Sequence, residues 1–248
     1  MIRVAISGAG GKLASAVIGA VSSADDLELT TLYNPSREGA EIEGREIAGS
    51  HDLVTADVVV EAAPPDAVET NLRLWRDLQV ATVVGTSGFT SEKLDDLREM
   101  WGTASPCLVV PNFSIGAVLM MRFAAEAASH FEATEIIERH GPMKSDAPSG
   151  TALATAMGVG AAGGRSSDTM GELVSGARGG EVEGIRIHSL RMPGVISQQE
   201  VAMANTGEVL SISHVSTSYE SFAGGAVAAI RGVRSLPGGI HVGLEAVL

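Results

Sequence analysis

Two titratable side chains, the imidazole of His140 and the ammonium of Lys144, stand close together near the middle of the sequence. Imidazole exchanges a proton near neutral pH, because its ordinary pKa is about 6.5, and an ammonium pairs with carboxylates. Ser149, Gly150 and Thr151 follow and lead into an apolar stretch with helical spacing. A helix N-terminus presents unpaired N–H groups and a positive dipole end, so it attracts carboxylate or phosphate. This segment therefore predicts a loop that binds a small acid and protonates it.

Each of these features also has a structural explanation. A single His in a loop is more often structural than catalytic, a single Lys is usually a solvated charge, and Ser149 is first of all an N-cap. The combination favours a site, because Gly, Pro and Ser residues shape one short loop that carries both His140 and Lys144. We therefore interpret this loop as a candidate active site.

The composition is that of a globular protein with one large domain or two smaller ones. The chain has 248 residues, of which 45% are hydrophobic and 19% are charged, unlike a disordered chain. The formal net charge of −13 argues against non-specific nucleic-acid binding, which depends on Lys and Arg. The same excess of acid repels anionic substrates, so we expect positive charge to be concentrated at the site.

Cysteine usage and hydropathy both point to the cytoplasm. The single Cys107 excludes an internal disulfide and a metal site built from several cysteines, as expected in a reducing compartment. The first apolar run is too short for a signal peptide. The apolar stretch 115–128 contains charged residues and is too short to span a bilayer. We expect a cytoplasmic protein with no metal site, no membrane partner and no nucleic-acid partner.

The first residues follow the pattern of a nucleotide-binding βαβ unit. Residues 1–6 form a short apolar run, a glycine-rich turn follows, and residues 13–22 have the spacing of an amphipathic helix. Glycines at such a turn let phosphate oxygens approach the N–H groups at the helix N-terminus. The pattern predicts a dinucleotide-binding turn. Its residues are Gly8, Ala9, Gly10, Gly11, Lys12 and Leu13.

The end of the second predicted strand, residues 27–33, bears on the choice of cofactor. Enzymes that select NAD usually carry an acidic residue there, which hydrogen-bonds the ribose 2′-hydroxyl. This chain has Asn34, Ser36 and Arg37 instead. These groups suit a 2′-phosphate, with Lys12 as a further cation, so we favour NADPH over NADH. The alternative is that Asn34 only makes a turn and Arg37 is solvated.

Strands and helices go on alternating through residue 115. Further strands are expected at 56–62, 81–84 and 107–110, and helices at 67–79 and 91–101. Such alternation predicts a Rossmann-like, doubly wound parallel sheet, whose ligands bind beyond the carboxyl ends of the strands. The turns that follow these strands should therefore converge on the cofactor. Their candidate cofactor-binding residues are Gly85, Thr86, Ser87, Val110, Pro111, Asn112 and Phe113.

After residue 116 the pattern changes to that of an α+β domain with an open mixed or antiparallel sheet and helices on one face. Its expected helices and strands are 117–130, 134–139, 150–162, 185–190, 195–205 and 208–216, and 222–234 is a closing helix. We predict a dinucleotide-binding domain of residues 1–115, to which residues 223–248 return. Residues 116–222 form the predicted substrate-binding and oligomerisation domain.

These motifs together resemble the dihydrodipicolinate reductase family of the lysine and diaminopimelate pathway. The resemblance covers most of the chain. The glycine turn is generic, whereas KSDAPSGTA is highly specific for that family, and the order and spacing of the other segments agree. The segments are GAGGK (8–12), VVGTSGF (83–89), VPNFSIGA (110–117), KSDAPSGTA (144–152), RMPGVISQQEV (191–201) and SFAGGAV (221–227).

The resemblance implies reduction of a cyclic dicarboxylate, 4-hydroxy-tetrahydrodipicolinate, to tetrahydrodipicolinate with NADPH or NADH. It implies that His140 is the proton donor and that Lys144 is a second donor and substrate contact. It also implies that Gly150 and Thr151, with Ser149 before them, bind a substrate carboxylate. Hydride transfer to a conjugated imine creates negative charge that a nearby acid quenches. Enzymes of the family are usually homotetramers joined through their substrate-domain sheets.

The loop departs from the family pattern next to the predicted proton donor. The family usually has two adjacent histidines, the second of which contacts substrate, whereas here Gly141 follows His140. One alternative is therefore a family relative that reduces a different cyclic imine or enamine acid. Another is a regulator that binds NADPH without catalysis, against which the intact His140–Lys144 pair argues.

Overall fold

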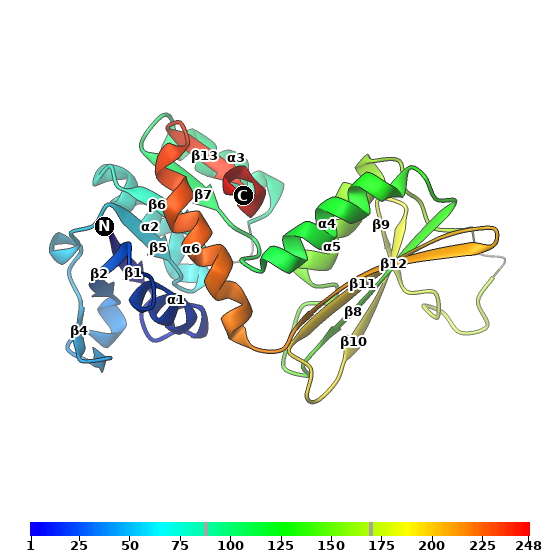
Figure 1. Ribbon diagram of the computed structural model, residues 1–248, viewed down its shortest axis with the longest axis horizontal. Coiled ribbons are helices and arrows are strands. Elements are labelled where there is room, and N and C mark those ends of the chain that lie inside the picture. The colour runs from blue at the N-terminus through cyan, green and yellow to red at the C-terminus, as the bar shows by residue number, and fades with distance from the viewer. Residues whose placement is uncertain (87–88, 169–170) are drawn as a thin grey trace. The chain divides into compact units, whose positions relative to one another are not determined.

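The computed structural model describes residues 1–86, 89–168 and 171–248, so the predicted cofactor residue Ser87 lies outside the described residues. The chain divides into two compact units (Figure 1). Unit 1 comprises residues 1–115 and 219–248, and unit 2 comprises residues 116–218. The return to unit 1 begins at residue 219 and not at 223, because the short helix η3 (Tyr219–Phe222) packs against α1 (Lys12–Ser22).

Unit 1 is built on an eight-stranded sheet in the order β13-β7-β6-β5-β1-β2-β4-β3. Its strands pair in parallel except for β3, which is antiparallel to β4 at one edge. The order reverses between β1 and β5, which makes the carboxyl end of β1 the switch point where ligands of such sheets bind. The strands are β1 (Ile2–Ser7), β2 (Leu27–Tyr33), β3 (Glu41–Ile42), β4 (Arg45–Ala48), β5 (Val58–Glu61), β6 (Ala81–Val84), β7 (Pro106–Val109) and β13 (Gly239–Val242).

Helices cover both faces of this sheet. In Figure 1, α1 and α6 (Ala223–Gly232) pack side by side in front of it, and α2 (Pro65–Asp77) and α3 (Ser91–Trp101) lie behind. Ala5 on β1 belongs to the core under α2 and α3, together with Trp75 and Trp101. Its neighbours Val4 and Ile6 point the other way and are equally buried. Burial on both sides explains why the predicted strands read as continuous apolar runs.

Unit 2 contains a five-stranded sheet in the order β12-β11-β8-β10-β9. The sheet is mixed, because β8 and β10 pair in parallel and the remaining pairs are antiparallel. Helices α4 (Ile115–Ala128) and α5 (Gly150–Ala161) cover one face (Figure 1). The strands are β8 (Ala133–His140), β9 (Gly180–Val182), β10 (Ile185–Arg191), β11 (Ser197–Asn205) and β12 (Glu208–Ser216). The predicted fold class, a Rossmann-like domain with a second α+β domain, is confirmed.

Small side chains let the two helices of unit 2 lie close to the sheet. Ala124 and Ala128 of α4 and Ala152 and Ala156 of α5 are fully buried there. They pack on Ile136 and other apolar residues that alternate along the strands. Because side chains alternate between faces of a strand, residues 138 and 140 of β8 point to the same helix-covered side as Ile136. This alternation positions the candidate active site.

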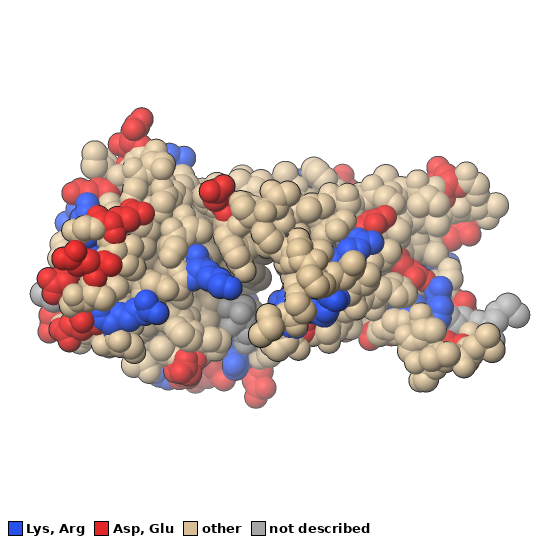
Figure 2. Space-filling model, turned by 90° about the horizontal axis from the view of Figure 1, so that it is seen from below, with Lys and Arg blue, Asp and Glu red and all other residues tan. Residues whose placement is uncertain are grey.

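Charge is unevenly distributed over the surface. In Figure 2, Asp and Glu side chains gather at the far left end, over unit 1, whereas Lys and Arg side chains form small groups in both units. In the part of the chain that the structure describes, no helix has the length and apolar character needed to cross a membrane.

Candidate active site

The glycine turn after β1 is so tightly packed that two of its positions accept no side chain. Gly8 has a φ of +78° and Gly10 one of +95°, a region that favours glycine. A Cβ on Gly8 would lie 2.5 Å from the backbone nitrogen of Ala63, and one on Gly10 would lie 2.7 Å from Arg37 Nη1. The Gly8 N–H donates to the carbonyl of Tyr33 at 2.9 Å. The turn therefore presents backbone, as phosphate binding requires.

The first turn of α1 carries N–H donors that no side chain caps. Its N-cap is Gly11, and no acidic residue lies in the first turn. By contrast, the hydroxyl oxygens of Thr90 and Ser149 cap α3 and α5. Because uncapped N–H groups at a helix N-terminus attract anions, Lys12 and Leu13 at the start of α1 fit the pyrophosphate of a dinucleotide.

Asn34 uses both ends of its side-chain amide to hold the glycine turn in place. Nδ2 donates to the carbonyl of Ala9 at 2.8 Å, and Oδ1 accepts from the Ser36 N–H at 3.1 Å. Asn34 thereby caps the short helix η1 (Pro35–Arg37). The amide predicted to contact the cofactor is engaged within the protein, where it fixes Ala9 and the start of η1. A direct cofactor contact from Asn34 or Ser36 stays a prediction.

Two cations flank the glycine turn. The guanidinium of Arg37 lies against Gly10, and Lys12 Nζ lies 5.6 Å from the ring centroid of Tyr219, within the range of a cation–π interaction. Among the described residues, neither Arg37 nor Lys12 forms an ion pair with a carboxylate. Positive charge without an internal partner suits a bound phosphate.

The other turns of unit 1 converge on the glycine turn, as the doubly wound topology predicts. A Cβ on Gly85 would lie 2.6 Å from side-chain atoms of both Leu13 and Phe113. Thr86 Oγ1 donates to the carbonyl of Ala63 at 2.7 Å. The turns after β1, β5, β6 and β7 thus touch one another, although cofactor contacts by Gly85, Thr86 and Phe113 stay predictions.

Two of the predicted cofactor residues after β7 have structural roles. The side chain of Val110 is buried, and its N–H continues the sheet by donating to the carbonyl of Val84 at 2.8 Å. Asn112 Oδ1 accepts from the Ser114 N–H at 2.8 Å, which stabilises the turn. Pro111 between them is exposed. Val110 can therefore offer only backbone to a ligand, and the cofactor contacts of Pro111 and Asn112 stay predictions.

Beneath the glycine turn lies a buried carboxyl group, Glu61 at the end of β5. Trp75 Nε1 donates to its Oε2 at 2.7 Å, and the Ala63 N–H donates to Oε1 at 2.8 Å. Burial raises the pKa of Glu61, while hydrogen bonds from Trp75, Ala63, Ser7 and Asn71 oppose the change. Glu61 anchors the backbone on which Gly8 packs, so its role is to support the turn.

In unit 2, His140 ends β8 and is held by a buried carboxylate. Its Nδ1 forms a short hydrogen bond with Glu138 Oε2, and the Glu138 side chain has 0% exposure. Arg191 reaches across from β10, with Nη1 2.9 Å from Glu138 Oε1 and 3.1 Å from Oε2. Nδ1 of His140 is thus occupied by a carboxylate, and this carboxylate is shared with an arginine.

These surroundings change the pKa values of the pair. Burial lowers the pKa of His140; Glu138 opposes this, and Lys144 and Arg191 lower the pKa further. Burial alone would raise the pKa of Glu138, but hydrogen bonds from Ser189, His140 and Arg191 together lower it. Near neutral pH the carboxylate is ionised, and the imidazole gives up its proton more readily than an ordinary histidine.

Lys144 lies in the loop that leaves β8, where the Lys144 N–H donates to the carbonyl of Gly141 at 3.2 Å. Its ammonium pairs with Asp146 at 2.9 Å and is 30% exposed. Burial would raise the pKa of Asp146, but the hydrogen bond from Lys144 and the charge of Arg191 lower it. Lys144 remains accessible to an anionic ligand that competes with Asp146.

At the N-terminus of α5, the predicted site for a substrate carboxylate, Ser149 has a structural role. Ser149 is buried, and its hydroxyl accepts from the Ala152 N–H at 3.2 Å as the N-cap. A substrate contact through that hydroxyl stays a prediction. Gly150 is exposed, and a Cβ there would meet no atom within 4 Å. The Thr155 hydroxyl donates to the Thr151 carbonyl at 2.7 Å, which fixes the turn.

The sequence predicted one site from His140, Lys144 and the α5 N-terminus but assigned no role to Glu138 or Arg191. Glu138 carried a signal, because residues two apart on a strand share a face and the predicted strand 134–139 ends one residue before His140. Arg191 carried none beyond its place in the RMPG segment, since only the parallel pairing of β8 with β10 sets Arg191 beside His140.

A parallel sheet with an uncapped glycine turn at its switch point, joined in one chain to a second unit whose loop carries His140 and Lys144, is the organisation of a dinucleotide-dependent reductase. The family models of the N-terminus and C-terminus of dihydrodipicolinate reductase match residues 2–113 and 116–248. The chain belongs to the dihydrodipicolinate reductase family. The resemblance inferred from the sequence motifs is confirmed.

Relatives and solved structures agree with this assignment. The 4-hydroxy-tetrahydrodipicolinate reductases of Thermobifida fusca and Nocardia farcinica are 44% and 42% identical over 100% of this chain and 99% and 98% of theirs. A dipicolinate-bound dihydrodipicolinate reductase from Paenisporosarcina sp. TG-14 matches with a TM-score of 0.85 and 32% identity, over 100% of both chains. An amine dehydrogenase from Mycobacterium smegmatis, 15% identical over 100% of this chain and 96% of its own, has a TM-score of 0.67 and shares the fold.

Proposed function

We propose that this chain reduces 4-hydroxy-tetrahydrodipicolinate to tetrahydrodipicolinate with NAD(P)H, as a step of lysine and diaminopimelate biosynthesis. The observation that carries the proposal is the loop of unit 2, where His140 on its buried carboxylate and Lys144 precede the N-terminus of α5. The relatives that bear this activity in their names match the chain over its full length.

The residues of the loop have different roles in binding and protonating a cyclic dicarboxylate. The backbone N–H groups at the start of α5, from Gly150 and Thr151, bind one carboxylate, and Lys144 exchanges Asp146 for a substrate carboxylate. The 4-hydroxyl group of the substrate leaves as water, which gives a conjugated imine, and His140 gives its proton to the atom that becomes negative when this imine is reduced. NAD(P)H, when bound, supplies the hydride for this reduction. The dipicolinate bound to the Paenisporosarcina reductase is a dicarboxylate of this kind.

A steady-state assay of NADPH oxidation with freshly generated 4-hydroxy-tetrahydrodipicolinate tests the proposal. We expect turnover by the purified chain and a fall of about two to four powers of ten in kcat for His140→Gln, the range for a positioned acid. His188→Gln is the matched control, since His188 pairs with Glu135 outside the loop, and it should keep its activity. Wild-type protein that oxidises no NADPH with this substrate would refute the proposal.

We also propose that NADPH is preferred to NADH. Arg37 and Lys12, with no carboxylate partner among the described residues, supply the charge that a 2′-phosphate needs. In Arg37→Gln the KM for NADPH should rise by roughly tenfold or more, the loss of about 1.5–3 kcal/mol expected for a charged hydrogen bond. The KM for NADH should change little. Equal changes for both cofactors would place Arg37 away from the 2′-phosphate.

The proposed enzyme is a cytoplasmic homotetramer joined through the sheets of unit 2. The buried, unpaired Cys107 suits a reducing compartment. The apolar residues Val209 and Val215 of β12 are 71% and 53% exposed, and β12 is an edge strand, which proteins usually cover or blunt. Light scattering of the purified chain should give four times the chain mass of 25.4 kDa.

A second candidate function is reduction of a different cyclic imine acid, which Gly141 favours. A Cβ on Gly141 would lie 3.1 Å from the carbonyl oxygen of Val195, so the backbone here fits glycine more easily than a second histidine. The same assay of NADPH oxidation separates the candidates. Low turnover of 4-hydroxy-tetrahydrodipicolinate, together with NADPH oxidation by another cyclic imine acid, would support the second candidate.

A further inference from the structure

Glu138 is a fully buried carboxylate on the helix-covered face of the unit 2 sheet. Its neighbours on the same face of the sheet include the apolar residues Ile136 and Val201. Burying a charge is costly unless it is paired and hydrogen-bonded. Glu138 Oε2 is hydrogen-bonded to His140 Nδ1 and accepts from Arg191 Nη1, and Oε1 lies 2.9 Å from the same Nη1. A buried charge with so many partners indicates a role in ordering those partners.

The geometry gives the two ring nitrogens of His140 different tasks. Nδ1 faces the Glu138 carboxylate, which can only accept, so the hydrogen of the neutral ring stays on Nδ1. In the part of the chain that the structure describes, no hydrogen bond engages Nε2. Nε2 is therefore the nitrogen that can carry and release a proton to a substrate. The ring cannot turn over without breaking its contact with Glu138.

The other charged groups near His140 are two cations and one anion, and the anion does not contact the ring. Arg191 comes from β10, and Lys144 comes from the loop after β8. Asp146 reaches the ring only through Lys144. Helix α5 has no charged residue, and the inward residue of β11 beside Glu138 is the neutral Gln199. Within the described residues, Glu138 alone contacts the ring as an anion.

Arg191 in turn holds the carboxylate. Nη1 lies 2.9 Å from Glu138 Oε1 and donates to the carbonyl of Leu190 at 2.8 Å. Nη2 donates to the carbonyl of Asp146, in the loop that carries Lys144. The Arg191 guanidinium thus links the Glu138 carboxylate, which holds His140, to the loop that leads into α5.

We propose that Glu138 is a positioning residue of this reductase, which fixes His140 in the tautomer and orientation that leave Nε2 free to donate a proton, while Arg191 locks the carboxylate. The proposal rests on the proposed function. It follows the general pattern in which a buried carboxylate on one imidazole nitrogen orients the other nitrogen for chemistry.

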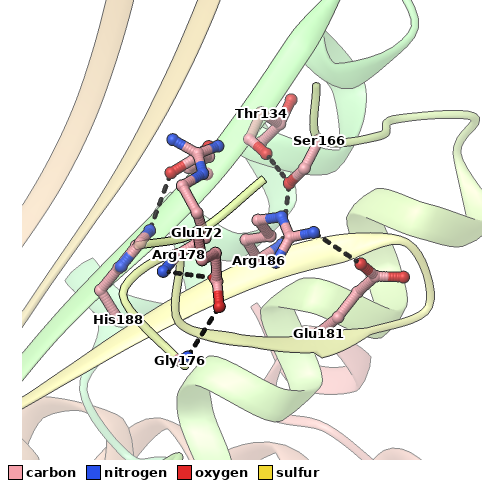
Figure 3. A network of polar contacts seen from close by, with 9 residues as sticks. Thr134, Ser166, Glu172, Gly176, Arg178, Glu181, Arg186 and His188 are labelled. Carbon is pink, nitrogen blue, oxygen red and sulfur yellow. Dashed lines mark hydrogen bonds and ion pairs between the residues drawn. The ribbon is translucent and has the colours of Figure 1, made fainter. Parts of the chain in front are cut away.

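The same strand offers a matched comparison. Glu135 lies three residues earlier on β8 and pairs with His188 at 2.8 Å and with Arg178. Figure 3 shows Arg178 and His188 together with Glu172, which accepts from the backbone N–H groups of residues 176 and 178. Glu135 is therefore also a glutamate between a histidine and an arginine, but its network does not include the His140 loop.

The experiment compares the pH dependence of Glu138→Gln with that of Glu135→Gln. In Glu138→Gln, kcat should fall by roughly 10- to 1,000-fold. This range lies between the loss of activity seen when a supporting hydrogen bond is removed and the larger loss seen when the carboxylate of a catalytic triad is removed. KM should change by less than about threefold, because Glu138 does not touch substrate. The falling limb of kcat/KM should move to lower pH, since an imidazolium without its carboxylate loses its proton more easily. Glu135→Gln should keep the wild-type profile.

A second measurement uses the unchanged protein, in case Glu138→Gln does not fold. Nitrogen-15 NMR of the imidazole of His140, assigned with His140→Gln, should show the neutral ring protonated on Nδ1. A ring protonated on Nε2, or a folded Glu138→Gln variant with wild-type kcat and pH profile, would overturn the positioning role. If the proposed function were wrong, the result would differ: wild-type protein would reduce no 4-hydroxy-tetrahydrodipicolinate. The tautomer of His140 could still be measured by NMR in that case.

Discussion

At the scale of single residues, the site depends on where charge is buried and where it is left unpaired. Glu138 and Glu61 are both fully buried carboxyl groups, yet they differ in their partners. Glu138 meets cations, so its pKa is lowered, whereas Glu61 meets neutral donors and its pKa is raised by burial. The first orders a titrating histidine and the second supports a backbone turn. Burial alone therefore does not mark a catalytic group.

The pH dependence of the wild-type enzyme follows from His140. A proton donor works in its charged form, and burial lowers the pKa of His140. Activity should therefore fall as pH rises, through a midpoint below the ordinary histidine pKa of about 6.5. The profile of kcat/KM, which reports groups of the free enzyme, measures it. A falling limb that persists unchanged in His140→Gln would assign the titration to another group.

At the scale of helices and strands, the two candidate anion sites are built differently. Helix α1 begins with a glycine N-cap and exposes its first N–H groups to a ligand, whereas Ser149 takes up one N–H of α5. Because the Ser149 hydroxyl occupies the N–H of Ala152, a bound anion can accept only from the N–H groups of Gly150 and Thr151. A single carboxylate fits such a reduced set, and a pyrophosphate fits the open turn of α1.

The Ser149 N-cap of α5 leads to a prediction in which the effect on protein stability can be separated from the effect on substrate binding. Ser149→Ala should lower the free energy of unfolding by about 1 kcal/mol, the usual cost of losing a hydroxyl cap. Thr90→Ala, which removes the corresponding cap of α3, should cost about the same. Only Ser149→Ala should also raise KM for the dicarboxylate, because the turn at Gly150 loses its anchor. Chemical denaturation and steady-state kinetics measure the two effects, and equal KM values in both variants would contradict the prediction.

The sequence predicted most elements of the fold, because burial on both faces leaves long apolar runs. It missed β3 and β4, which are short and largely exposed, and β13, which follows Pro237 and two glycines. It also missed β9, which lies at the end of a glycine-rich connection. In the site, the loop residues were predictable from one continuous segment. The Glu138–Arg191 contact was not, because strand pairing across the sheet creates it.

At the scale of the whole molecule, the predicted ligands fall on different units. The candidate cofactor residues lie in unit 1, and the candidate acid-binding residues lie in unit 2. Each unit has its own buried cluster, with Trp75 and Trp101 in the first and Ile136 and Met203 in the second. Units with separate cores unfold independently unless a large interface couples them.

We therefore expect calorimetry of the protein to show two unfolding transitions that respond to different ligands. NADPH at 100 times its Kd should stabilise one unit by about 2.7 kcal/mol, which raises its Tm by roughly 5–10 °C for a domain of this size. Pyridine-2,6-dicarboxylate should raise the other transition alone. In Arg37→Gln the NADPH shift should shrink while the dicarboxylate shift persists, and His140→Gln should leave the NADPH shift intact. A single transition that both ligands raise equally would contradict independent unfolding and show that the two cores unfold together.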